Sequence, residues 1–121
     1  MRLNMAVATV LLVLCGGSWV LAQGPATGNP KRGQTIYEQL CQRCHGEKLD
    51  GKGPEAKWLR TPPADLQSLS SMVKSDWELL IIMSHGVSFT PMHGFRDVLN
   101  EQEMRDLLSF IRLRAPFAPI S

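Results

Sequence analysis

Residues able to hold a cofactor are concentrated in one short stretch, Cys41-Gln42-Arg43-Cys44-His45. Two thiols three residues apart on a helix lie on one face, and the imidazole that follows is directed toward the same side. This Cys-x-x-Cys-His spacing is typical of covalent attachment of c-type haem, where the thiols add across the two vinyl groups of the porphyrin. We therefore predict a haem fixed by Cys41 and Cys44, with His45 as the proximal iron ligand.

Two other chemistries use a Cys-x-x-Cys pair. A thioredoxin-like dithiol is expected in a βαβ context, and this chain has no convincing strands. A structural zinc site needs a fourth ligand and usually a second paired cluster. Beyond His45, the chain after residue 22 offers only His85 and His93, and no further cysteine. Both alternatives are therefore less favoured than haem.

Residues 1–22 have the pattern of an export signal. An apolar run, Met5–Cys15, is followed by the small-residue cleavage site Val20-Leu21-Ala22. An uncleaved membrane anchor is one alternative, and a lipid-modified Cys15 is another. Leu14 disfavours the lipid because a small residue is expected directly before the modified cysteine. We predict cleavage after residue 22 and a periplasmic location.

The remaining chain is nearly neutral and has room for one small domain. Removal of Arg2 with the signal leaves 12 Lys and Arg against 11 Asp and Glu, a net charge of about +1. This balance does not indicate binding to nucleic acid or to an anionic membrane surface. We assign 23–29 to a flexible leader, 30–115 to the domain and 116–121 to a C-terminal tail. Because so small a domain has a marginal core, we expect the haem-free chain to be largely unfolded.

The first helix should begin with Asn29 as N-cap and Pro30 at the first helical position, and should run to about Cys44. It carries an apolar stripe at helical spacing, formed by Gly33, Ile36, Tyr37 and Leu40. Gly33 inside a helix suits the close approach of another helix backbone.

The middle of the chain should support His45 from behind. A short helix is predicted over Pro54–Arg60, and the sequence Thr61-Pro62-Pro63 then requires extended backbone. A carbonyl of this segment would accept the Nδ1 proton of His45 and fix the orientation of its ring. We expect that carbonyl to belong to Pro62 or Pro63.

Two capping boxes mark the later helices. Ser75 and Glu78 begin a helix that is apolar nearly all round and stops at His85-Gly86. Asn100 and Glu103 begin a last helix, which ends before Pro116. The irregular loop between these helices, residues 87–99 (the methionine loop), carries Met92 and His93.

The whole pattern resembles the class I c-type cytochromes over about residues 30–114. The resemblance rests on the positions Gly33, Tyr37, Cys41, Cys44, His45, the methionine loop, Leu107, Leu108, Phe110 and Ile111. It implies an all-α fold, with three main helices and a short one wrapped around one covalently bound haem. It implies His45 as proximal and Met92 as distal iron ligand, and a crossing of the first and last helices at Gly33 and Tyr37.

One departure leaves the sixth ligand open. In the family a proline often follows the distal methionine, whereas here Pro91 precedes Met92 and His93 follows it. We expect Met92, with His93 as the rival that would give bis-histidine iron, and with Met83, His85 and Met72 as further alternatives. Candidates for an apolar wall around the ring are Trp58, Trp77, Phe89 and Phe95, and Trp58 or Arg60 are candidates to hold a propionate.

His/Met ligation without an open iron position suits a one-electron carrier, since both oxidation states keep the same ligands. We predict a periplasmic, monomeric carrier without a membrane span in its mature form. Its partners would be a periplasmic dehydrogenase, reductase or terminal oxidase. The alternatives are a sensor or peroxidase-like enzyme with an exchangeable sixth ligand, which needs distal acid–base residues, and a fixed cytochrome subunit of an oxidoreductase complex.

Overall fold

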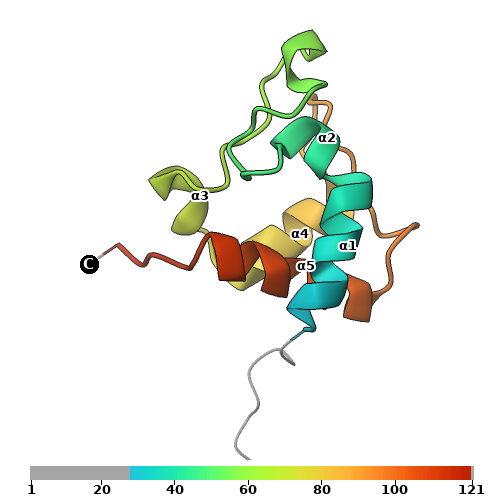
Figure 1. Cartoon of the computed structure of the whole chain (residues 1–121), viewed down its shortest axis with the longest axis vertical. Coiled ribbons are helices and arrows are strands. Elements are labelled where there is room, and N and C mark those ends of the chain that lie inside the picture. Colours follow the sequence, from blue (N-terminus) through green and yellow to red (C-terminus); the bar gives the residue numbers. More distant parts are fainter. Residues whose placement is uncertain (1–27, 121) are drawn as a thin grey trace, which may run out of the picture.

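The computed structural model describes residues 28–120, and in this part of the chain the regular structure is helical (Figure 1). The helices are α1 (Pro30–Leu40), α2 (Gln42–His45), α3 (Leu69–Met72), α4 (Asp76–His85) and α5 (Glu101–Arg114), with a 3-10 turn, η1, at Ala56–Trp58. The expected all-α architecture is confirmed. The predicted export signal and nearly all of the predicted leader, residues 1–27, lie outside the described residues. Between residues 28 and 120, no helix has the length and apolar character needed to cross a bilayer.

The first helix begins as predicted and ends earlier. The Asn29 side chain accepts hydrogen bonds from the backbone N–H groups of Lys31 and Arg32, and Pro30 occupies the first turn. The prediction of one helix as far as Cys44 is wrong, because the backbone bends at Cys41 (φ −114°, ψ −37°) and α2 starts anew. The carbonyl of Cys41 accepts from both Cys44 and His45, so the attachment motif forms its own tight turn.

Both predicted capping boxes are present. The Ser75 hydroxyl accepts from the backbone of Glu78 and the Glu78 carboxylate accepts from the backbone of Ser75, and Asn100 and Glu103 make the same reciprocal pair. The short helix expected over residues 54–60 is reduced to the 3-10 turn η1. Helix α3 was not predicted, because four residues are too few to show a periodic apolar pattern.

Helices α1 and α5 cross at close range, as expected (Figure 1). A Cβ atom at Gly33 would collide with the backbone carbonyl of Asp106, so only glycine permits this approach. One turn later the Tyr37 ring packs on Phe110, with 5.3 Å between ring centroids. Tyr37 and Leu107 are each only 1% exposed, and they form the centre of the core around the crossing.

The buried carboxylate of Asp106 ties the start of α1 to α5. It accepts a hydrogen bond from the Asn29 backbone N–H at 2.7 Å and one from the Gln102 amide at 3.0 Å, and Arg32 Nε lies 2.9 Å away. Burial by itself would raise the pKa of Asp106, but these hydrogen bonds and the Arg32 charge outweigh it and hold the pKa below its usual value. The ionised form is therefore stabilised by folding.

This arrangement predicts an acid-dependent contribution to stability. A folded-state pKa below the unfolded value stabilises the protein above the unfolded pKa, near 3.9 for Asp, and the contribution is lost as pH falls through the folded value. We expect Asp106→Asn to lower the free energy of unfolding at neutral pH by about 1–3 kcal/mol. In urea titrations, the difference in the free energy of unfolding between Asp106→Asn and wild type should shrink as the pH is lowered from the unfolded pKa through the folded pKa of Asp106. The exposed Asp97→Asn serves as control, and an equal loss at every pH would contradict the assignment.

The C-terminal part of the chain is tied to the corner between α3 and α4. Arg112 Nε lies 2.7 Å from the Asp76 carboxylate, and the same guanidinium donates to the backbone carbonyl of Lys74. The Phe117 ring lies against Arg112, and the N–H of Ala118 donates to the carbonyl of Met72 at 3.0 Å. These contacts fix the position of the α3–α4 corner relative to α5.

Candidate functional site

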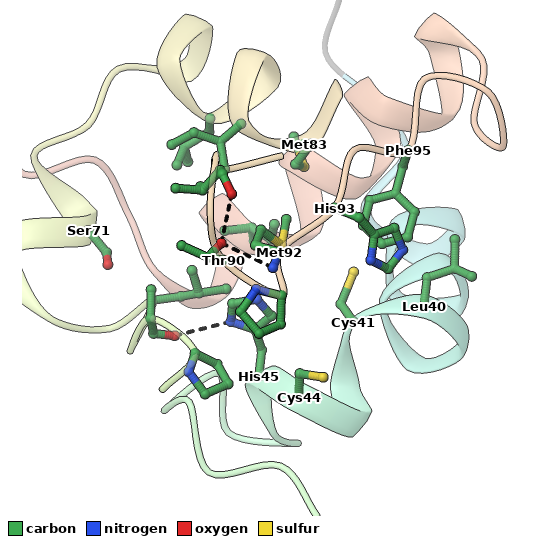
Figure 2. Close-up of a pocket in the computed structure, with 18 of the residues that line it drawn as sticks. Leu40, Cys41, Cys44, His45, Ser71, Met83, Thr90, Met92, His93 and Phe95 are labelled. Carbon is green, nitrogen blue, oxygen red and sulfur yellow. Dashed lines mark hydrogen bonds between the residues drawn. The ribbon is translucent and has the colours of Figure 1, made fainter. Parts of the chain in front are cut away.

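A cavity of about 310 Å³ brings the predicted functional residues together (Figure 2). It is bounded by the end of α1 with α2, the extended segment 59–66, the α3–α4 corner, α4, the methionine loop and α5. Its lining includes all the cofactor-binding candidates: Cys41, Cys44, His45, Met92 and His93. Most other lining side chains are aliphatic, and such an apolar hollow with a few polar groups is typical of a cofactor site.

Cys41 and Cys44 are partly buried, not joined in a disulfide, and lie beside His45 in the close-up view (Figure 2). Burial raises the pKa of the Cys41 thiol to about 12, and the neighbouring Cys44 adds to the shift. Burial and the Glu55 carboxylate also raise the pKa of Cys44, with a partial offset from Arg43. In the folded chain both sulfurs are therefore thiols at neutral pH.

The loop after α2 folds back and holds the motif in place. Gly51 donates from its N–H to the carbonyl of His45 at 2.8 Å, and Gly53 donates to the carbonyl of Cys44 at 3.0 Å. Gly51 has φ +76°, and a Cβ there would lie 2.6 Å from the carbonyl oxygen of Pro63. The buried Tyr37 hydroxyl donates to the carbonyl of Gly46 at 2.7 Å. Tyr37 thus links the helix crossing to the loop that supports the motif.

The carbonyl behind His45 belongs to Ala64, so the prediction of Pro62 or Pro63 is wrong. His45 Nδ1 lies 3.1 Å from the Ala64 carbonyl oxygen. The register of this segment is set by the hydrogen bond from Leu66 N–H to the Leu49 carbonyl, which a sequence does not reveal. Burial lowers the pKa of His45, with a partial offset from the Ala64 hydrogen bond. A neutral ring that donates from Nδ1 has its free lone pair on Nε2, which is the form that binds a metal.

The methionine loop is folded tightly against the end of α4. The N–H of Val87 donates to the carbonyl of Met92 at 2.8 Å, and the Thr90 hydroxyl both donates to the Val87 carbonyl and accepts from the N–H of Met92. Met92 is partly buried and packs against the core. His93 is exposed, and its ring lies against Phe95 with 4.5 Å between centroids.

The apolar wall differs from the prediction. Trp58 is 77% exposed, Trp77 is 71% exposed and Phe89 is fully exposed, so these three aromatic residues do not line the cavity. Phe95 does. The rest of the wall is mainly aliphatic, with Leu79, Ile82, Met83, Leu107 and Ile111 from α4 and α5. The nearly all-round apolar character of α4 was the sequence signal for this wall.

Comparison with known families gives a match over most of the chain. Residues 28–111 match the family described as cytochrome c oxidase, cbb3-type, subunit III. No curated protein sequence matches the chain.

Three solved structures illustrate the similarity of fold. The reducing HAO-like protein complex Kustc0457/Kustc0458 of Kuenenia stuttgartiensis is 18% identical, with a TM-score of 0.63, over 73% of this chain and 43% of that one. The KustC0563 c-type cytochrome is 23% identical, with a TM-score of 0.55, over 68% of this chain and 95% of that one. The dihydro-heme d1 dehydrogenase NirN, solved in complex with DHE, is 26% identical, with a TM-score of 0.54, over 66% of this chain and 15% of that one. This chain therefore spans less than half the length of the first and third of these neighbours.

Proposed function

The chain belongs to the family described as cytochrome c oxidase, cbb3-type, subunit III, and has the fold of a small c-type cytochrome, and from this we propose that it is a periplasmic one-electron carrier with a single haem c. The observation that carries the proposal is the convergence of the Cys-x-x-Cys-His motif and Met92 on one apolar cavity. When bound there, the haem supplies an Fe(II)/Fe(III) couple.

Each residue of the motif has a distinct task in this proposal. Cys41 and Cys44 form the two thioether bonds, which keep the ring in the cavity in both oxidation states. His45 binds iron through Nε2, because its Nδ1 proton is held by the Ala64 carbonyl. That hydrogen bond fixes the plane of the imidazole and makes it a stronger donor to iron.

Met92 is proposed as the ligand on the opposite face. The backbone of Met92 is held by hydrogen bonds with Val87 and Thr90. The position of the thioether is therefore set by the protein and need not change when the iron changes oxidation state. A thioether ligand favours Fe(II) and raises the redox potential, and the aliphatic wall acts in the same direction because it disfavours the additional charge of Fe(III). The contact of His93 with Phe95 supports Met92 over His93.

A second candidate role is that of a fixed haem subunit in an oxidoreductase complex. Two observations favour it: the matching family is described as an oxidase subunit, and one similar structure is a protein complex. The electron-transfer chemistry would be the same, and the partner would be permanent. Affinity purification of the full chain from its native membrane and periplasmic fractions separates the two roles, since a fixed subunit co-purifies with its enzyme in constant ratio.

Mass spectrometry of the exported protein tests the proposal. The full chain should be expressed with a periplasmic haem-attachment system, and we expect a polypeptide beginning at Gln23 that carries the mass of one haem. Peptide mapping should place that mass on the fragment with Cys41 and Cys44. A mature chain without added mass would refute the function, and a chain that keeps residues 1–22 would refute cleavage alone.

A further inference from the structure

The cavity has a polar end on the side away from the cysteines. In the close-up, Ser71 lies across the cavity from Cys41 and Cys44, with His45 and Met92 between them (Figure 2). Ser71 is 8% exposed, and its hydroxyl donates to the carbonyl of Asp65 at 2.7 Å. The α3–α4 corner, to which Ser71 belongs, thus forms the wall opposite the attachment motif.

Two residues with basic side chains line the cavity, Arg43 and Lys74. Arg43 lies between the two cysteines in the sequence, and its Nε is 3.7 Å from the Glu55 carboxylate. Lys74 belongs to the opposite end, where its backbone N–H donates to the carbonyl of Ser71 at 3.2 Å. Its ammonium donates to the Ser70 carbonyl at 3.1 Å, which uses one of its three protons. The remaining two are available to an anion.

The chemistry of the ring determines what reaches this end. A haem has its two vinyl groups on one half of the porphyrin and its two propionates on the other half. A haem attached to Cys41 and Cys44 would therefore direct its propionates toward Ser71 and Lys74. We infer that Lys74 binds a haem propionate, an inference that rests on the proposed haem site. An ammonium–carboxylate hydrogen bond beside an otherwise apolar cavity neutralises a charge that would be costly to leave unpaired.

The backbone at Lys74 is held in place independently of its side chain. The Arg112 guanidinium donates to the Lys74 carbonyl and also pairs with Asp76, so a residue of α5 fixes the corner. Trp58 and Arg60, the candidates from the sequence, do not line the cavity. Because the backbone is held in this way, a substitution of the Lys74 side chain leaves the fold of the corner intact.

The test compares Lys74→Met with Lys74→Arg in the haem-loaded protein. Resonance Raman spectra report the propionate bending bands directly, and spectroelectrochemistry reports the midpoint potential. We expect Lys74→Met to shift the bending bands and to lower the potential, because an unneutralised carboxylate favours Fe(III). Lys74→Arg should keep both values close to wild type.

Lys57→Met is the matched control. It removes the same charge from a lysine whose ammonium lies 4.9 Å from the Trp58 ring and which does not line the cavity. Unchanged bending bands in a haem-loaded Lys74→Met protein would overturn the inference while the proposed function stands. Equal shifts in Lys57→Met would also overturn it, since they would reflect net charge alone. Absence of covalent haem from the wild type would instead refute the proposed function.

Discussion

Replacement of both Cys41 and Cys44 by serine will leave a chain that holds no covalent haem and is largely unfolded at room temperature. The reason lies in the position of the cavity, which separates the attachment motif and the 59–66 segment from α4 and α5. Without a cofactor the aliphatic side chains that line it face water instead of a ring. Far-ultraviolet circular dichroism and thermal unfolding of the purified variant measure the loss.

The expected size of the effect follows from the volume of the cavity. At about 24 cal/mol per Å³, a scale measured for apolar cavities, a cavity of about 310 Å³ corresponds to about 7 kcal/mol. Small domains have total stabilities of about 5–15 kcal/mol. The expected loss is therefore comparable to the whole stability of a typical small domain.

Gln42→Ser is the control for this prediction, since it places serine within the same motif and removes no thiol. It should retain haem and wild-type helicity. A double cysteine variant with native helicity and a cooperative thermal transition would show that the helices pack without the cofactor, and it would contradict the expected role of the ring as part of the core.

Substitution of Met92 by alanine should change the iron without unfolding the chain. The oxidised protein should lose the weak long-wavelength absorption band that a thioether ligand gives to ferric haem. The reduced protein should bind carbon monoxide at once, because the distal position is then open. The midpoint potential should fall by a sizeable part of the roughly 0.8 V range that axial ligands span.

Two variants serve as controls for the distal ligand. Met83→Leu changes a buried thioether that also lines the cavity, and His93→Ala removes the rival ligand. Both should keep the long-wavelength band. A Met92→Ala protein that retains the band, or a wild type that lacks it and loses its low-spin spectrum in His93→Ala, would exclude Met92 as the ligand.

Features that depend on short stretches of chain could be predicted from the sequence. The attachment motif, the cap at Asn29 and the two capping boxes each involve residues within a few positions of one another, so their geometry follows from local backbone preferences. Gly33 also indicated a helix crossing, because a glycine inside a helix can be recognised in the sequence even though the helix that it contacts is distant along the chain. The all-α class followed from these elements together.

Tertiary structure alone decided which groups meet across long sequence separations. The carbonyl behind His45 is that of Ala64 because the Leu49–Leu66 hydrogen bond sets the register, and a shift of one or two residues would have presented a proline instead. Three of the four aromatic residues expected at the wall, Trp58, Trp77 and Phe89, are exposed, because apolar composition alone does not specify which of these side chains faces the core. The position of Lys74 depends on Arg112, more than thirty residues away, which fixes the α3–α4 corner. The sequence by itself thus determined the kind of site, and the packing of distant segments decided which side chains and carbonyls surround it.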